Sequence, residues 1–360
     1  MKIVHVVESF AGGVYDFLVS LTGSLTEYQH VIIYSMREYT PPNFKKDFPE
    51  GTKFVRWKGA TREINPLKDL IALVNLMWLL KVTKGIDVIH LHSSKAGFLG
   101  RLSARILGLS YKVIYTTHGV SFLRQDVSLW TRKQFIYLEK LAHKFGGKII
   151  TCSRSECAEF RKYGMEADYI YNSIDCNLIS GECVSKREDV IVVGTMGRIT
   201  YQKGPQLYNK IATHFLTYPK VKFLWIGDGD LKKELIAENI EVTGWLCEGE
   251  SIQQLERVDI YLSTSLWEGL PLSVLKAMCL CKPLILSDCV GNRDLVLPYF
   301  NGYLFSNIEE AVKSLIDLIN DPVKRKKWGE NSKQIVIQKF SLSKMVFRYK
   351  TLYEGLLSLC

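Results

Sequence analysis

The chain has 360 residues and a mass of 41.2 kDa, which predicts two domains of roughly 150–200 residues each. Hydrophobic residues make up 47% of it and charged residues 23%, a mixture that excludes collagen-like, low-complexity and wholly disordered chains. The net charge of +10 favours anionic partners such as phosphates, nucleotides or acidic lipids.

Cysteines and apolar runs narrow the class of protein further. The nine cysteines show no C-x2-C spacing, so we expect reduced, mostly buried thiols. No uncharged apolar run reaches the roughly 18 residues that a membrane span requires. The chain opens directly on a strand-like run, which indicates no targeting peptide.

The first half alternates β-branched or aromatic runs with helical patterns. We expect strands at 3–7, 31–34, 54–57, 88–92, 112–117, 148–152 and 169–171. We expect helices at 14–25, 66–83, 96–107, 129–145 and 154–162. Continuous apolar strands separated by helices predict a doubly wound α/β fold with a parallel sheet covered on both faces.

A second set of strands follows a polar stretch at 176–188, which we interpret as a linker. These strands are expected at 190–194, 221–226, 260–263 and 284–287. We therefore predict two Rossmann-like parallel-sheet domains, at 1–180 and 188–342, with a terminal helix at 343–360 that packs back on the first. Residues 1–185 carry 24 basic and 17 acidic residues, an excess that suits an anionic lipid or acceptor, or an ordinary solvated surface.

Ligands of open parallel sheets bind beyond the carboxyl ends of the strands, so the residues that follow each strand are informative. Gly12 and Gly13 form a tight turn that could present backbone N–H groups to an anion, or a plain turn. His118 follows the fifth strand and is well placed to bond a ligand hydroxyl. His90 and His92 share one strand face, where packing or a substrate contact is favoured over a metal ion because no third ligand accompanies them.

In the second half, Arg198 and Lys203 flank a short loop before a helix, a pattern typical of a diphosphate clamp, with a solvated loop as the alternative. Asp230 is interpreted as the cap of a helix that begins at Leu231, in preference to a metal site. Glu268 follows a strand beside a helix N-terminus, with Pro271 in the first helical position. A carboxylate there can bond sugar hydroxyls while backbone N–H groups bond phosphate.

Together these motifs resemble the retaining glycosyltransferases of family 4, which have the GT-B architecture of two Rossmann-like domains facing across a cleft. The motifs that carry the resemblance are Gly12-Gly13, Thr117-His118-Gly119, Asn172-Ser173-Ile174-Asp175, Gly197-Arg198 with Lys203-Gly204, Gly227-Asp228-Gly229 and Ser265 through Met278. The resemblance implies sugar transfer from a nucleotide diphosphate donor, with UDP as the expected nucleotide, with retention of configuration and without metal or another cofactor.

The same resemblance implies roles for single residues. Arg198 and Lys203 would hold the diphosphate, Glu268 would face the hydroxyls of the donor sugar, and His118 would touch that sugar from the other domain. The further positions assigned to donor or acceptor binding are Gly12, Gly13, Gly197, Gly269, Leu270, Pro271, Lys276, Asn292 and Arg293.

One position departs from the family pattern E-x7-E, whose second Glu bonds the nucleotide ribose. Eight residues after Glu268 the chain has Lys276. An ammonium donates hydrogen bonds but accepts none, so ribose recognition should weaken or change. Two hypotheses remain open: an active glycosyltransferase, or a non-catalytic nucleotide-sugar-binding subunit that is degenerate at Lys276.

The leading hypothesis is transfer of one sugar to a lipid-linked glycan acceptor in bacterial O-antigen or capsule synthesis. The basic first half and the helix at 66–83 would then lie against the anionic inner face of the plasma membrane, as a peripheral cytoplasmic protein. We expect no nucleic-acid partner, because the basic residues are spread out and no stacking-aromatic module accompanies them.

Overall fold

The computed structural model describes residues 1–61, 63–179 and 190–357, which form two compact units. The first unit joins Met1–Asn172 to the C-terminal helix, which starts at Leu342, and the second unit spans Ser173–Ser341. Most of the predicted linker at 176–188 lies outside the described residues.

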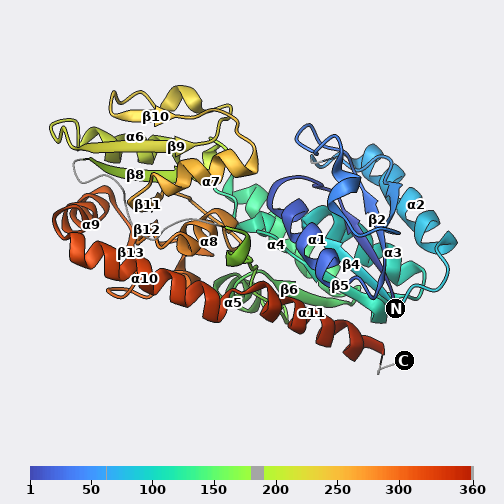
Figure 1. The fold of residues 1–360 in the computed structure, drawn as a ribbon. Helices are drawn as coiled ribbons and strands as arrows, with labels where there is room; N and C mark the ends of the chain where they lie inside the picture. The colour runs from blue at the N-terminus through green and yellow to red at the C-terminus, as the bar shows by residue number, and fades with distance from the viewer. Residues whose placement is uncertain (62, 180–189, 358–360) are drawn as a thin grey trace. The chain divides into compact units, whose positions relative to one another are not determined.

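The first unit is a parallel sheet of seven strands in the order β3-β2-β1-β4-β5-β6-β7 (Figure 1). The strands are β1 Lys2–Val7, β2 Gln29–Tyr34, β3 Lys53–Arg56, β4 Val88–His92, β5 Val113–Thr116, β6 Lys148–Thr151 and β7 Asp168–Tyr169. Its helices are α1 Gly12–Ser24, α2 Pro66–Val82, α3 Ser94–Ile106, α4 Leu129–His143, α5 Arg154–Lys162 and α11 Leu342–Leu357.

Helices cover both faces of this sheet. Helices α1 and α11 bury Phe17, Tyr349 and Tyr353 in one hydrophobic core together with residues of β1, β2, β4, β5 and β6. Helix α3 packs tightly on the other face, since a Cβ atom at Gly97 would come within 2.4 Å of the Tyr115 ring. The C-terminal helix thus forms part of the first core although it is the last element of the chain.

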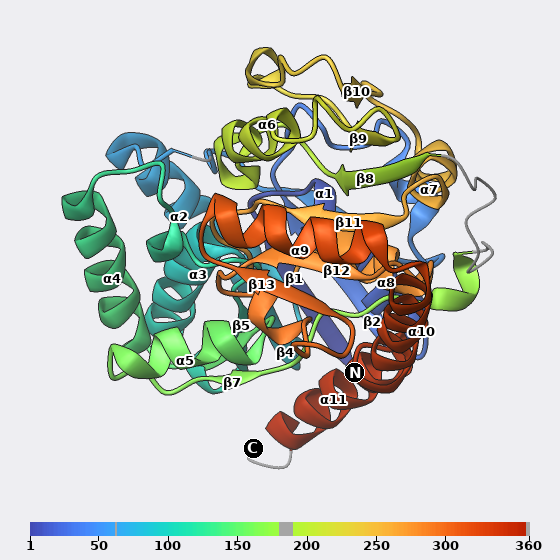
Figure 2. The ribbon, with the colours of Figure 1, turned by 90° about the vertical axis from the view of Figure 1, so that its left-hand side faces the viewer.

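The second unit is a parallel sheet of six strands in the order β10-β9-β8-β11-β12-β13. The strands are β8 Ile191–Met196, β9 Val221–Ile226, β10 Ile240–Val242, β11 Ile260–Ser263, β12 Leu284–Ser287 and β13 Gly302–Phe305. Its helices are α6 Pro205–Thr213, α7 Glu248–Glu256, α8 Leu272–Cys279, α9 Ile308–Asn320 and α10 Pro322–Lys339. Apolar residues of α6 and α9 share the core on one face of the sheet (Figure 2).

The predicted fold class is confirmed: both sheets are parallel, doubly wound and covered by helices. The two edge strands β10 and β13 were not predicted. Strand β10 has only three residues with a central Glu241, and β13 starts with a glycine, so neither has the long apolar run that indicates a buried strand.

Three further predictions can be compared with the structure. Cys176 and Cys279 form a disulfide, so the expectation of reduced thiols is wrong for this pair. No α-helix begins at Leu231, because the chain makes only one 3-10 turn, Lys232–Glu234. Among the described residues, no helix is both long and apolar enough to cross a membrane.

Candidate active site

The strand order of the second unit reverses between β8 and β11, and the loops after these two strands carry most of the predicted donor-site residues. Such a reversal point is where open α/β sheets bind ligands. Lys203 lies after β8 and Glu268 lies after β11, and Lys203 Nζ donates to Glu268 Oε1 at 2.7 Å. The structure therefore pairs two of the three predicted catalytic residues of this unit directly, and the third, Arg198, follows β8 in the same loop as Lys203.

Backbone contacts hold the two loops together. Gly204 has φ +63°, and a Cβ atom there would come within 2.3 Å of the Thr264 carbonyl, so the close approach requires glycine. The Thr264 hydroxyl donates to the Lys203 carbonyl at 2.8 Å, and Leu266 N–H donates to the Gln202 carbonyl at 2.8 Å. These bonds fix the Lys203 backbone against the loop that carries Glu268.

Glu268 is only 6% exposed and is held from several sides. Its N–H donates to the Val290 carbonyl at 3.1 Å, and the Gln202 amide lies 3.4 Å from its second carboxylate oxygen. Gly291 leaves room for it, since a Cβ atom there would lie 2.8 Å from the Glu268 Cβ. Burial acts to lower the pKa of Lys203, but the adjacent Glu268 carboxylate together with Tyr261 and Cys289 outweighs burial and raises the pKa, so Lys203 stays charged.

The other predicted donor-site residues surround this pair in different ways. Arg198 is exposed after β8, next to Gly197, whose carbonyl accepts from Trp225 Nε1 at 2.9 Å. Gly269, Leu270 and Pro271 are buried between Glu268 and α8. Pro271 is the N-cap residue of α8, whereas the sequence predicted it in the first helical position, so the helix begins one residue later than predicted.

Asn292 and Arg293 follow β12. Asn292 is fully buried and its amide donates to the Ser287 carbonyl at 3.1 Å, while its Oδ1 has no hydrogen-bond partner among the residues that the structure describes. Arg293 is exposed and pairs with Asp288 at 2.5 Å. Asn292 therefore ties this loop to β12, and Arg293 is the more accessible of the two.

Lys276, the departure from the family pattern, is paired with an acidic residue. Its Nζ lies 2.6 Å from Glu248 Oε1 at the start of α7, with side-chain exposures of 16% for Lys276 and 75% for Glu248. A carboxylate is thus present beside position 276, although it comes from another helix.

His118 follows β5 in the first unit, in the left-handed region with φ +53°. The loop around it is held by the fully buried Glu156 of α5. This carboxylate accepts from Thr117 Oγ1 at 2.7 Å and from three backbone N–H groups: Val120 at 2.8 Å, Cys152 at 3.0 Å and Gly119 at 3.2 Å. Sequence reasoning missed Glu156, although Ser153 and Glu156 have the S-x-x-E spacing of a capping box.

Both ring nitrogens of His118 have partners inside the first unit. Nε2 lies 3.1 Å from His92 Nδ1, and Nδ1 lies 3.6 Å from the Cys152 sulfur. Burial lowers the pKa of His118 to about 3, so the ring is neutral at physiological pH. Gly12 and Gly13 are exposed at the start of α1, where Gly12 has φ +56°.

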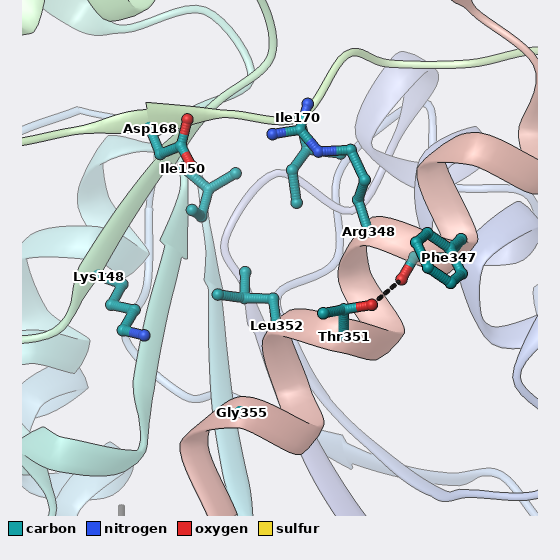
Figure 3. Close-up of a pocket in the computed structure, with 9 residues that line it drawn as sticks. All are labelled: Lys148, Ile150, Asp168, Ile170, Phe347, Arg348, Thr351, Leu352 and Gly355. Atoms are coloured by element: carbon teal, nitrogen blue, oxygen red, sulfur yellow. Dashed lines mark hydrogen bonds between the residues drawn. The ribbon is translucent and has the colours of Figure 1, made fainter.

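A pocket of about 310 Å³ lies elsewhere in the first unit, where α11 meets β6 and β7 (Figure 3). Its lining includes Lys148, Asp168 and Arg348 but none of the predicted site residues. Phe347 of α11 also lines it and is largely exposed. This pocket is separate from the residues that follow the central strands.

Comparison with known proteins agrees with this geometry. Residues 11–178 match the family Glycosyltransferase Family 4, and residues 183–335 match Glycosyl transferases group 1. The chain is 29% identical over 323 residues to the Escherichia coli UDP-Gal:alpha-D-GlcNAc-diphosphoundecaprenol alpha-1,3-galactosyltransferase, with 81% of each chain covered. It is 28% identical over 296 residues to the O-antigen biosynthesis glycosyltransferase WbnH of E. coli, covering 80% of this chain and 82% of that one.

A solved structure shares the fold. Anabaena HepE in complex with UDP-glucose superposes with a TM-score of 0.78 at 19% identity, covering 98% of this chain and 100% of HepE. Fold and sequence together define a glycosyltransferase with the two Rossmann-like domains of the GT-B class. The chain belongs to glycosyltransferase family 4 and is of the bacterial surface-polysaccharide type.

Proposed function

We propose that this protein transfers a sugar, with retention, from a UDP-sugar to a lipid-linked glycan acceptor in bacterial O-antigen, lipopolysaccharide or capsule synthesis. The observation that carries the proposal is the Lys203–Glu268 pair at the reversal point of the second sheet. The name of the E. coli galactosyltransferase supports it, since that relative uses UDP-Gal and a diphosphoundecaprenol acceptor.

The charges after β8 fit the departure of a nucleoside diphosphate. When the bond from the anomeric carbon to the β-phosphate breaks, negative charge develops on the phosphate oxygens. Lys203 stays protonated and is held in place by the loop contacts, and Arg198 adds a second cation close by in the chain. Fixed cations at the point where charge develops lower the barrier without reorganisation.

Transfer with retention requires no second carboxylate in this scheme. The acceptor hydroxyl oxygen forms its bond to the anomeric carbon on the face from which the phosphate leaves, and its proton passes to a leaving phosphate oxygen. Glu268 binds sugar hydroxyls and orients the ring, and no metal ion is needed to balance the charge.

The alternative is a non-catalytic subunit that binds nucleotide sugars. Lys276 motivates it, because an ammonium cannot accept hydrogen bonds from ribose. The neighbouring Glu248 carboxylate, which pairs with Lys276, favours the active enzyme, since it supplies an acceptor in the same place.

The surface that we propose to bind the membrane lies on α2. Six large apolar side chains on this helix are 49% to 77% exposed and recur at the spacing of one helical face: Leu67, Leu70, Ile71, Val74, Trp78 and Val82. Exposed lysines flank them at 68 and 81. The opposite face of α2 is also apolar and packs into the unit, so the exposed side chains form an apolar surface patch, and a patch of this kind beside lysines is typical of a surface that binds anionic lipid.

Vesicle sedimentation tests this face. We expect the chain to bind vesicles that contain anionic phosphatidylglycerol, and a Leu70→Gln, Val74→Gln, Trp78→Gln variant to lose at least tenfold in affinity. The control is Val323→Gln in the second unit, which is 78% exposed and should change nothing. Equal binding of the triple variant and the wild type would contradict this assignment.

The function itself is tested with undecaprenyl diphosphate-linked N-acetylglucosamine and a panel of UDP-sugars, with EDTA present. We expect a lipid-linked disaccharide with the anomeric configuration of the donor. UDP binding without product for any donor would instead favour the binding subunit.

A further inference from the structure

Five of the seven histidines of the chain gather on one face of the first sheet. The parallel register brings them together, because His5 of β1 pairs with His90 of β4, and His92 pairs with Thr116 of β5. His30 enters from β2 and His118 from the loop after β5. This face is the one covered by α1 and α11, where Phe17 lies 4.7 Å from the His118 ring.

Four of these rings form an unbroken chain of hydrogen bonds. His30 Nδ1 lies 3.2 Å from His5 Nε2, His5 Nδ1 lies 3.2 Å from His92 Nε2, and His92 Nδ1 lies 3.1 Å from His118 Nε2. Burial lowers the pKa of each of the four, so each ring is neutral and carries one N–H donor and one acceptor nitrogen.

One end of this chain of hydrogen bonds, at His30, determines which ring donates in every bond. His30 Nε2 lies 2.9 Å from the Leu25 carbonyl, which can only accept, so His30 carries its proton on Nε2. His30 Nδ1 must then accept from His5 Nε2–H. The same logic makes His92 donate to His5 and makes His118 donate to His92.

The other end is consistent with this direction. His118 Nδ1 must accept, and the Cys152 thiol lies 3.6 Å from it. Burial raises the pKa of Cys152, so the thiol keeps its proton and can donate. A backbone carbonyl is neither protonated nor deprotonated at physiological pH. The chain of histidine hydrogen bonds therefore cannot conduct protons past Leu25, and it serves only to orient the rings.

We propose that His30, His5 and His92 are positioning residues that fix the ring of His118, with its Nε2 proton directed into the first unit. His118 then holds its loop in the left-handed conformation. Its ring can donate a hydrogen bond to a ligand only by breaking its hydrogen bond to His92. The effect on sugar transfer rests on the function proposed above, whereas the proton positions do not.

Nitrogen-15 NMR of the full chain with labelled histidine tests the proton positions without any substrate. We expect His5, His30, His92 and His118 each to show a protonated Nε2 and an unprotonated Nδ1, unchanged between pH 6.5 and 8. Single His→Gln variants assign the signals. A protonated Nδ1 on any of the four rings would overturn the proposal.

His30 provides a matched pair of variants far along the chain from His118. Gln can donate to the Leu25 carbonyl and accept from His5, so His30→Gln should keep the Nε2–H pattern of His118 and the rate of transfer. His30→Leu removes the last hydrogen bond, so that the chain of hydrogen bonds stops at His5. We then expect His118 to be a mixture of the Nδ1-protonated and Nε2-protonated forms. We also expect a kcat lower by about 10- to 100-fold, with UDP affinity unchanged. Equal behaviour of the two variants would contradict a positioning role.

Two further readouts keep the test decisive. His92→Gln and His92→Leu form a second pair if loss of His30 unfolds the chain, with the same expected difference. His5, His90 and His92 also offer nitrogens within 4.8 Å of one another, so Zn²⁺ is added as a probe. One tightly bound Zn²⁺ that removes the Nε2–H signals of His5 and His92 would replace the hydrogen-bond chain by a metal site and overturn the proposal.

Discussion

The two units have the same kind of sheet, but the polar groups that support His118 in the first unit and Lys203 in the second differ in charge. In the first unit these groups are neutral imidazoles in a directed hydrogen-bond chain. In the second unit an ion pair, Lys203–Glu268, occupies the reversal point. A shared fold therefore supports two kinds of preorganisation, one by proton position and one by charge.

The largest expected effect is that of low pH, which should destabilise the first unit much more than the second. The folded pKa values of His5, His90, His92 and His118 are lowered, so below pH 6.5 the unfolded state binds more protons and stability falls with pH. At pH 5.5 each of these histidines lowers the unfolding free energy by an amount on the order of 1 kcal/mol. The raised pKa of Glu156 acts in the opposite direction and offsets a part of this loss.

Hydrogen exchange read separately for the two units checks this. We expect the protection of the first unit to collapse between pH 7.5 and 5.5, and that of the second unit, whose one histidine is His214, to change far less. Equal losses in both units would remove the contrast between them.

Removing the cation of the second unit should have the next largest effect. We expect Lys203→Met to lower the rate of sugar transfer by about 10²- to 10³-fold, because Lys203 lies where charge develops on the leaving phosphate. Steady-state release of UDP measures this. Lys233→Met, an exposed lysine of the same unit, is the control and should keep the wild-type rate.

The clamp on the His118 loop should have a smaller effect, on stability. Glu156→Gln removes a carboxylate that accepts four hydrogen bonds, and we expect a loss of about 1–3 kcal/mol in unfolding free energy by urea denaturation. Glu159→Gln on the same helix is the control. A variant as stable as the wild type would mean that the loop is held by other contacts.

The Lys276–Glu248 pair should give the smallest effect, because Glu248 is mostly exposed and such pairs contribute about 0–1 kcal/mol. We expect Lys276→Glu to weaken UDP binding by tenfold or less, and the double swap with Glu248→Lys to restore it. A large gain in UDP affinity for Lys276→Glu alone would instead identify a degenerate site.

The sequence predicts most of the second unit's site because its residues directly follow strands. Glu268 and Lys203 could be placed near the ends of β11 and β8 from apolar runs alone, and the structure brings them within 2.7 Å. Their ion pair could not be foreseen, since it depends on the adjacency of β8 and β11, whose paired residues are 67 positions apart in the chain.

The first unit shows what a linear pattern leaves out. His5 and His92 contact each other only because of the strand order β1–β4, and His90 and His92 looked like an isolated pair in the sequence. Glu156 holds backbone groups 36 and 37 residues away, and Cys176 reaches Cys279 across 103 residues. Such contacts follow from register and packing, which spacing alone does not reveal.

The central claim is that Lys203 in the second unit binds the diphosphate of the donor. Calorimetric titration of UDP, GDP and ADP into the wild type and Lys203→Met, in EDTA, tests it most directly. We expect micromolar binding of UDP to the wild type without metal, weakened at least tenfold in the variant. No binding of any nucleotide to the folded protein, or equal binding of UDP to both forms, would contradict it.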